Sequence, residues 1–97
     1  MLNPDVKEYI ISTHARFEMG RRGLTETDIG AVVTQPQQKL EIRPGRCIYQ
    51  SMVCCGEPPK EYLDRVVIDV DRSPAVVVTV YRTSKVKNME VSHESCV

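Results

Sequence analysis

Four strand-like runs in the second half of the chain constrain its fold more than any other feature. They are rich in Val, Ile, Leu and Tyr, they are separated by turn-forming residues, and they cover residues 39–43, 46–55, 62–70 and 75–83. The connections are short enough for hairpins, so successive strands are expected to pair antiparallel. The last run is apolar on both faces from Val76 to Val80, which predicts that this strand lies inside the sheet.

Two helices are predicted ahead of these strands. The first covers about residues 13–22, because Ser12 can cap its start and Gly23 offers the left-handed conformation that ends many helices. The second begins after the capping residue Thr25 and ends before Pro36, since the residue before proline avoids helical geometry. Residues 1–8 are expected to be a lead-in, followed by a short apolar segment at 9–11.

The predicted fold class is therefore α+β, with two N-terminal helices packed on one face of a four-stranded antiparallel sheet. One domain accounts for residues 1–97, with an ordered core at about 8–87 and a polar C-terminal tail at 88–97. This arrangement leaves the other face of the sheet partly open, which is a common place for a ligand groove.

Composition narrows the classes of function. The formal net charge is zero, which argues against general nucleic-acid binding but leaves room for a local basic patch. The cysteines have no zinc-type spacing, so we expect reduced thiols, no bound metal and no cofactor. No apolar run is long enough to cross a membrane and the N-terminus does not resemble a signal peptide, so the sequence predicts a cytoplasmic protein without membrane contact.

His14 is the first candidate catalytic residue. It falls in the first turn of the first predicted helix, where free backbone N–H groups attract phosphate and disfavour protonation of an imidazole. A neutral imidazole there is available as a general base. The alternative is that His14 packs at the helix–sheet junction with one hydrogen bond.

The polar end of the last strand is the second candidate. Alternation places Tyr81, Thr83 and Lys85 on one face and Arg82 on the other. A phenol, a hydroxyl and an ammonium on one side can bind phosphate and assist proton transfer. The alternative is an ordinary polar strand end, with Tyr81 at the rim of the core.

Arg65 is the third candidate, because it interrupts an apolar strand and requires either an acidic partner or a solvent-facing cleft. Its face depends on the register of the last hairpin. If position 70 pairs with position 75, Arg65 shares a face with Arg82 and Asp64 shares a face with Tyr81, whereas a shift by one residue reverses this. The sequence leaves both registers open, and it leaves both a structural ion pair and a substrate-binding role open for Arg65.

Two stretches, residues 12–25 and 76–85, resemble a family of small prokaryotic domains known as domain-of-unknown-function family four-two-five-eight. The resemblance covers roughly residues 8–87. This family is similar in layout to the BrnT and RelE/ParE toxins, which implies a RelE-like or BrnT-like fold and, more weakly, an endoribonuclease with an antitoxin partner. The residues that match the family motif are His14, Met19, Arg22, Gly23, Tyr81, Thr83 and Lys85.

The leading hypothesis is a metal-independent endoribonuclease of a toxin–antitoxin system, with RNA as substrate and an antitoxin protein as partner. The expected catalytic residues are His14, Tyr81, Thr83 and Lys85, and the expected substrate-binding residues are Arg22, Arg65 and Arg82. RNA cleavage by the 2′-hydroxyl group needs only such acids, bases and cations. The alternative hypothesis is a non-enzymatic protein- or nucleic-acid-binding module with the same fold.

Overall fold

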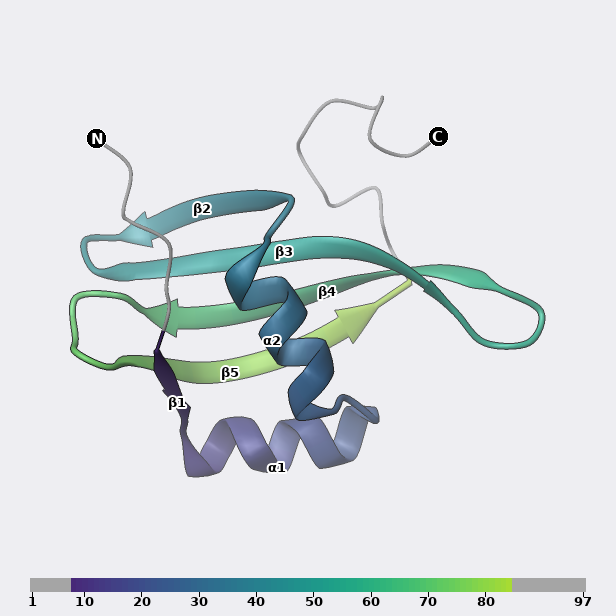
Figure 1. Ribbon diagram of the computed structural model, residues 1–97, viewed down its shortest axis with the longest axis horizontal. Helices are drawn as coiled ribbons and strands as arrows, with labels where there is room; N and C mark the ends of the chain where they lie inside the picture. The colour runs from purple at the N-terminus through teal and green to yellow at the C-terminus, as the bar shows by residue number, and fades with distance from the viewer. Residues whose placement is uncertain (1–7, 85–97) are drawn as a thin grey trace.

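A curved five-stranded sheet forms the centre of the computed structural model, which describes residues 8–84 (Figure 1). The elements in chain order are β1 (Tyr9–Ile11), α1 (Thr13–Arg22), α2 (Glu26–Thr34), β2 (Gln38–Arg43), β3 (Arg46–Cys55), β4 (Lys60–Asp69) and β5 (Ala75–Thr83). The strand order is β1-β5-β4-β3-β2, and β1 runs parallel to β5 while the other neighbours are antiparallel. The two helices and the overall α+β class agree with the sequence prediction.

The predicted four-stranded antiparallel sheet is wrong, because the segment at residues 9–11 is a fifth strand. Its three residues pair with residues 75–77 of β5 in parallel register, and so short a segment has too few alternations to be recognised as a strand. A four-stranded meander would have left β5 at the edge. The presence of β1 places residues 75–77 of β5 between two strands, so the prediction that the Val-rich run lies inside the sheet is confirmed for its beginning, Val76 and Val77.

Helix α1 begins where β1 ends, and Ser12 connects the two elements to β5. The backbone N–H of Ser12 donates to the carbonyl oxygen of Val77 (3.0 Å), and its hydroxyl donates to the carbonyl oxygen of Val78 (3.1 Å). The same hydroxyl oxygen accepts the backbone N–H of Ala15 and caps the helix. Gly23, with φ of 70°, ends the helix as predicted.

Strand β5 contains a β-bulge at the place where Ser12 binds it. Val67 of β4 lies opposite Thr79, but its neighbour Ile68 lies opposite Val77, so that Val78 is an additional residue in β5. The bulge shifts the register of the hairpin by one residue between its two ends. Consequently, side chains after Val78 point to the opposite face from the one that unbroken alternation from Val77 would give them.

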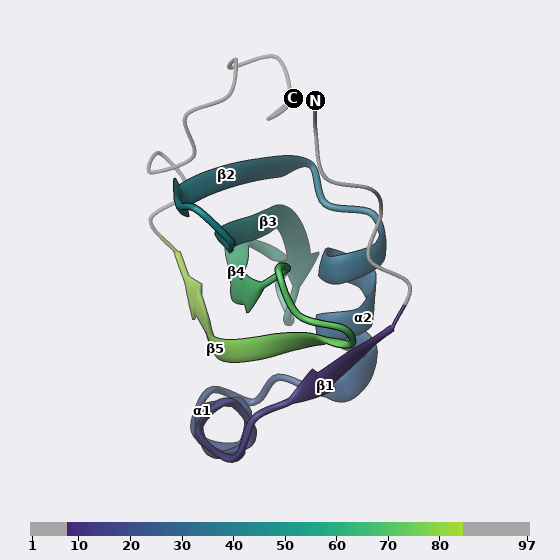
Figure 2. The ribbon, with the colours of Figure 1, turned by 90° about the vertical axis from the view of Figure 1, so that its left-hand side faces the viewer.

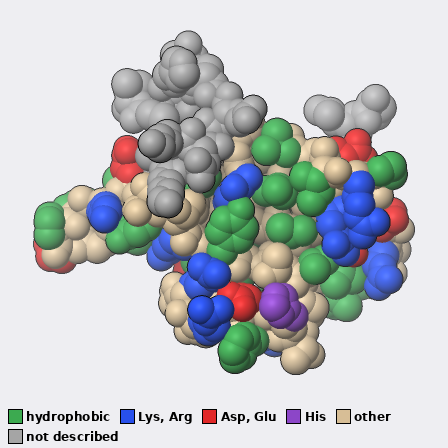
Figure 3. Space-filling view, turned by 180° about the vertical axis from the view of Figure 1, so that it is seen from behind, with side chains coloured by type: hydrophobic (Ala, Val, Ile, Leu, Met, Phe, Trp, Pro, Cys, Tyr) green, Lys and Arg blue, Asp and Glu red, His purple; other side chains and the backbone are tan. Residues whose placement is uncertain are grey.

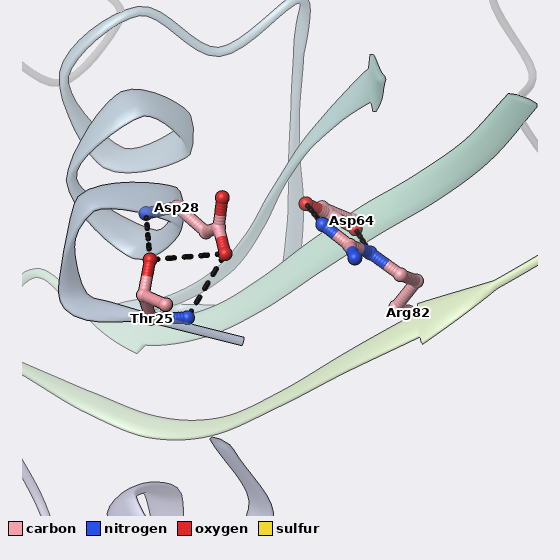
Figure 4. A network of polar contacts seen from close by, with 4 residues as sticks. All are labelled: Thr25, Asp28, Asp64 and Arg82. Carbon is pink, nitrogen blue, oxygen red and sulfur yellow. Dashed lines mark hydrogen bonds and ion pairs between the residues drawn. The ribbon is translucent and has the colours of Figure 1, made fainter. Parts of the chain in front are cut away.

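Helix α2 begins with a capping box, in which Thr25 and Asp28 each bind the other's backbone N–H (Figure 4). It lies across the face of the sheet over β3 and β4, whereas α1 runs alongside β5 at the edge (Figures 1 and 2). The prediction that both helices pack on one face of the sheet is therefore wrong for α1, which lies along the edge beside β5. They still share one core, whose central members are Ala15, Met19, Leu24, Ile29, Val32, Val33, Tyr49, Val66, Ile68, Val77 and Val80.

Within residues 8–84, neither helix is long and apolar enough to cross a membrane. The predicted polar tail at residues 88–97 lies outside the described part of the chain.

Replacing Ser12 with alanine is expected to lower the free energy of unfolding by about 1–2 kcal/mol, because it removes the helix cap and the hydroxyl contact to Val78. Urea denaturation followed by circular dichroism measures this change. The control is Ser84→Ala at an exposed position, which is expected to change stability by less than about 0.5 kcal/mol. Equal stability of the two variants would show that Ser12 does not anchor the helix.

Candidate functional site

Tyr81 lies between two arginines on the sheet face opposite α2. The register after the bulge places Arg65 directly opposite Tyr81, with its guanidinium carbon 5.4 Å from the centre of the tyrosine ring. The guanidinium of Arg22, in the last turn of α1, lies 5.8 Å from the same centre. Both distances are within the range of cation–π attraction, so the phenol ring holds two positive groups at one place on the surface.

Glu18 orients the helix side of this cluster. Its carboxylate accepts hydrogen bonds from Arg22 (3.0 Å) and Arg21 (3.2 Å), although its own side chain is only 10% exposed. The hydrogen bond from Arg22, together with Arg21, lowers the pKa of Glu18 from its ordinary value of 4.5. Together with Arg65 beside Tyr81, this region holds three guanidinium groups and the one carboxylate of Glu18, so it carries positive charge in a protein whose net charge is zero.

Arg65 has no ion pair within residues 8–84, and its Nε atom is buried without a hydrogen-bond partner there. The sequence had left open a structural pair with an acidic residue, and among the described residues the structure gives Arg65 an aromatic neighbour instead. A guanidinium whose Nε has no partner within the described residues, on a partly open face, is suited to bind an oxyanion or a carbonyl oxygen.

His14 lies on the same side of α1 as Glu18 and Arg22, since these residues are four apart along the helix. It is exposed in the first turn of the helix, which does not match the alternative of a packed histidine. The guanidinium of Arg22 contacts the carboxylate of Glu18, and the backbone of Glu18 lies about 6 Å further along the helix axis than that of His14. The structure therefore places His14 in one row with the charged groups beside Tyr81.

Two further residues, Thr83 and Lys85, were predicted to be catalytic. Thr83 follows Tyr81 on the same face by strand alternation, while Lys85 lies outside the described residues. Figure 3 shows this face, where charged side chains and a histidine gather beside hydrophobic ones.

Arg82 points to the opposite face, where it forms a two-pronged ion pair with the buried carboxylate of Asp64, at 2.6 and 2.9 Å (Figure 4). This hydrogen-bonded carboxylate raises the pKa of Arg82 above its already high ordinary value. Arg82 is thus separated from Tyr81 and Arg65. Arg82 lines an open cleft of about 410 Å³ together with Arg22, Cys55 and Tyr62. Its predicted role in substrate binding stays a prediction, and it would apply to a substrate bound in this cleft.

Two polar residues of the site were missed by the sequence analysis. Glu18 had a recognisable signal, because a glutamate three and four residues before arginines on a helix favours ion pairs. Gln50, which lies opposite Arg65 on β3, had none, since its position depends on two strand registers.

The described part of the chain contains no candidate metal-binding site. No group of three or more His, Cys, Asp or Glu side chains there could hold a metal ion. Cys47, Cys54 and Cys55 form no disulfide within the described residues, and Cys96 lies outside them. The expected absence of a metal and of a cofactor stays a prediction.

Comparison with known proteins identifies the family, because residues 11–82 match the family described as Domain of unknown function (DUF4258). The chain belongs to this family. The match spans α1 and β5 up to Arg82, so the cluster around Tyr81 is part of the DUF4258 domain. It confirms the predicted family membership, and the family description assigns no activity. No curated protein and no solved structure matches the chain.

Replacing Glu18 with glutamine is expected to lower the free energy of unfolding at pH 7. The pKa of Glu18 in the folded state is lower than its ordinary value of 4.5. The ionised carboxylate therefore stabilises the fold at pH values above 4.5, and this stabilisation is lost as the pH falls through the lower pKa of the folded state. The difference between wild type and Glu18→Gln should therefore narrow at acidic pH.

Urea denaturation at pH 7 and at several values below the ordinary pKa of glutamate tests this expectation. Glu61→Gln is the control, because Glu61 is exposed on β4. A difference for Glu18→Gln that stays constant over the whole pH range would contradict the assigned ion pairs.

Proposed function

We propose that this DUF4258 domain is a metal-independent endoribonuclease that binds its RNA substrate at the face formed by α1 and β5. The observation that carries the proposal is the position of Tyr81 between the guanidinium groups of Arg22 and Arg65. Arginines bind phosphate oxygens through several donors, and an aromatic ring beside them offers a surface on which a base can stack.

The chemistry of RNA cleavage fits the residue types of this face. A base removes the proton of the 2′-hydroxyl group, the 2′-oxygen attacks the neighbouring phosphorus, and the 5′-oxygen leaves with a proton from an acid. The products are a 2′,3′-cyclic phosphate and a 5′-hydroxyl end. His14 is the proposed base, and the hydroxyl groups of Tyr81 and Thr83 are the candidates for proton transfer to the leaving oxygen.

Charge stabilisation is the proposed task of the arginines. The phosphorane-like transition state carries more negative charge on the phosphate oxygens than the substrate does, so cations in place before reaction lower its energy. Arg22 is held by Glu18 and Arg65 by its strand, and oriented donors of this kind need little rearrangement. Lys85, one residue beyond the described part of the chain, is proposed to add a further cation at this strand end.

A protein-binding module is the second candidate. Phe17 on α1 and Ile10 on β1 are 63% and 54% exposed, and exposed large apolar side chains on neighbouring elements can form part of a protein interface. A partner of the antitoxin type would bind there. A ribonuclease cleaves RNA, whereas a protein-binding module does not, so a cleavage assay distinguishes the two functions.

The test is cleavage of a fluorescently labelled single-stranded RNA in the presence of a chelator. Wild type is expected to release products that end in a 2′,3′-cyclic phosphate. His14→Ala and Arg22→Ala are each expected to reduce the rate by roughly a hundredfold or more, because each removes a group that acts in the transition state.

The matched control is Arg72→Ala, which removes an exposed arginine in the turn before β5 and away from Tyr81. It should cleave at the wild-type rate, and circular dichroism should show that all variants are folded. Absence of cleavage by wild type, or full activity in folded His14→Ala and Arg22→Ala, would refute the ribonuclease. Binding of RNA without cleavage would favour the binding module.

A further inference from the structure

A row of polar side chains crosses four strands on the face that carries Tyr81. In the strand registers Tyr81 lies opposite Arg65, Arg65 lies opposite Gln50, and Gln50 lies opposite Gln38. Residues directly opposite each other on neighbouring strands point to the same face, so these four side chains form a continuous line from β5 to β2. With neighbouring strands about 4.8 Å apart, Tyr81 and Gln50 are separated by roughly 10 Å.

The middle of this row contains one donor and one acceptor that are not used. Gln50 is completely buried, and its amide nitrogen donates to the side-chain oxygen of Gln38. The other end of the same amide, the Oε1 atom, has no hydrogen-bond partner among residues 8–84, and neither has the neighbouring Nε of Arg65. Buried polar atoms without partners cost free energy, and a ligand that supplies the missing groups recovers it.

Apolar side chains border the row on both sides. One neighbouring level consists of Val67, Ile48 and Leu40, and the other contains Leu63 and Met52. None of these five residues belongs to the core beneath α2, and all except Leu63 are partly exposed. The face therefore combines a partly exposed apolar surface with a narrow line of hydrogen-bonding groups.

From this arrangement we infer that the row of Arg65, Gln50 and Gln38 recognises the base of the nucleotide whose phosphate binds beside Tyr81. The inference rests on the proposed function. A nucleobase is flat and apolar on its faces, and its edge carries a hydrogen-bond donor next to an acceptor, which complements Gln50 Oε1 and Arg65 Nε. Because both atoms are buried, the bound base is expected to displace the groups that cover them. Carboxamide and guanidinium groups are the side chains that most often form paired hydrogen bonds with base edges.

RNA explains the row better than a peptide does, because the row is continuous with the positive cluster. A single nucleotide presents a phosphate and a base edge connected by a sugar, and the protein presents cations at Tyr81 and an amide at Gln50. The row would then determine which nucleotide is bound, while the arginine cluster would bind every nucleotide alike.

The test uses four short single-stranded RNAs that differ only in their central base and are 2′-O-methylated to prevent cleavage. Fluorescence anisotropy gives the affinity of each. Wild type is expected to bind them with affinities that differ by roughly fivefold or more, as expected for paired hydrogen bonds to a base. Gln50→Met and Gln38→Met are expected to reduce this spread to about twofold or less.

Two controls separate base recognition from general binding. Gln35→Met makes the same change at the exposed end of α2 and should keep the wild-type preference. Arg22→Ala should weaken all four complexes to a similar degree and leave the preference unchanged. Urea denaturation verifies that each variant is folded. If Gln50→Met does not fold, the base preference of Gln38→Met, at the partly exposed end of the row, tests the inference.

The outcomes are distinguishable. Equal affinities in wild type, or an unchanged preference in the folded glutamine variants, would overturn base recognition and leave the ribonuclease proposal standing. No binding of any of the four RNAs by wild type would overturn both.

Discussion

Ser12 binds strand β5 through two groups at once, and the rest of the structure depends on this contact. Its N–H and its hydroxyl donate to the carbonyl oxygens of Val77 and Val78, while its oxygen caps α1. The two carbonyl groups flank the bulge in β5, where the ladder of the sheet is locally interrupted. One residue thus ends β1, begins α1 and provides hydrogen bonds to the irregular point of β5.

The bulge decides which side chains share a face. After Val78 the register places Arg65 opposite Tyr81 and Asp64 opposite Arg82, so that one arginine joins the open face and the other forms an ion pair on the face that carries α2. A regular hairpin with the register of residues 68 and 77 would instead have placed Asp64 opposite Tyr81 and Arg65 on the same face as Arg82. The combination of cations around Tyr81 is therefore a consequence of one additional residue in the strand.

Local signals predicted the helices, their caps and the four longer strands, because these depend on neighbouring residues such as Ser12, Thr25 and Gly23. The fifth strand and the bulge were not predictable, since a three-residue strand has no period and the position of a bulge depends on hydrogen bonds between distant segments. The same limit applies to the site. Chemistry indicated Tyr81 and Arg65, but only the register brings them together, and only two registers reveal Gln50.

RNA binding at the face formed by α1 and β5 underlies both proposed roles of this domain. Solution NMR of the isotope-labelled protein, titrated with a short 2′-O-methylated single-stranded RNA, tests it most directly. Chemical-shift changes are expected to be concentrated at Arg22, Arg65 and Tyr81, and to weaken as salt is added because phosphate contacts are screened. Shift changes confined to the polar pocket at the opposite end of the sheet, around Arg43 and Arg72, or no changes at all, would contradict it.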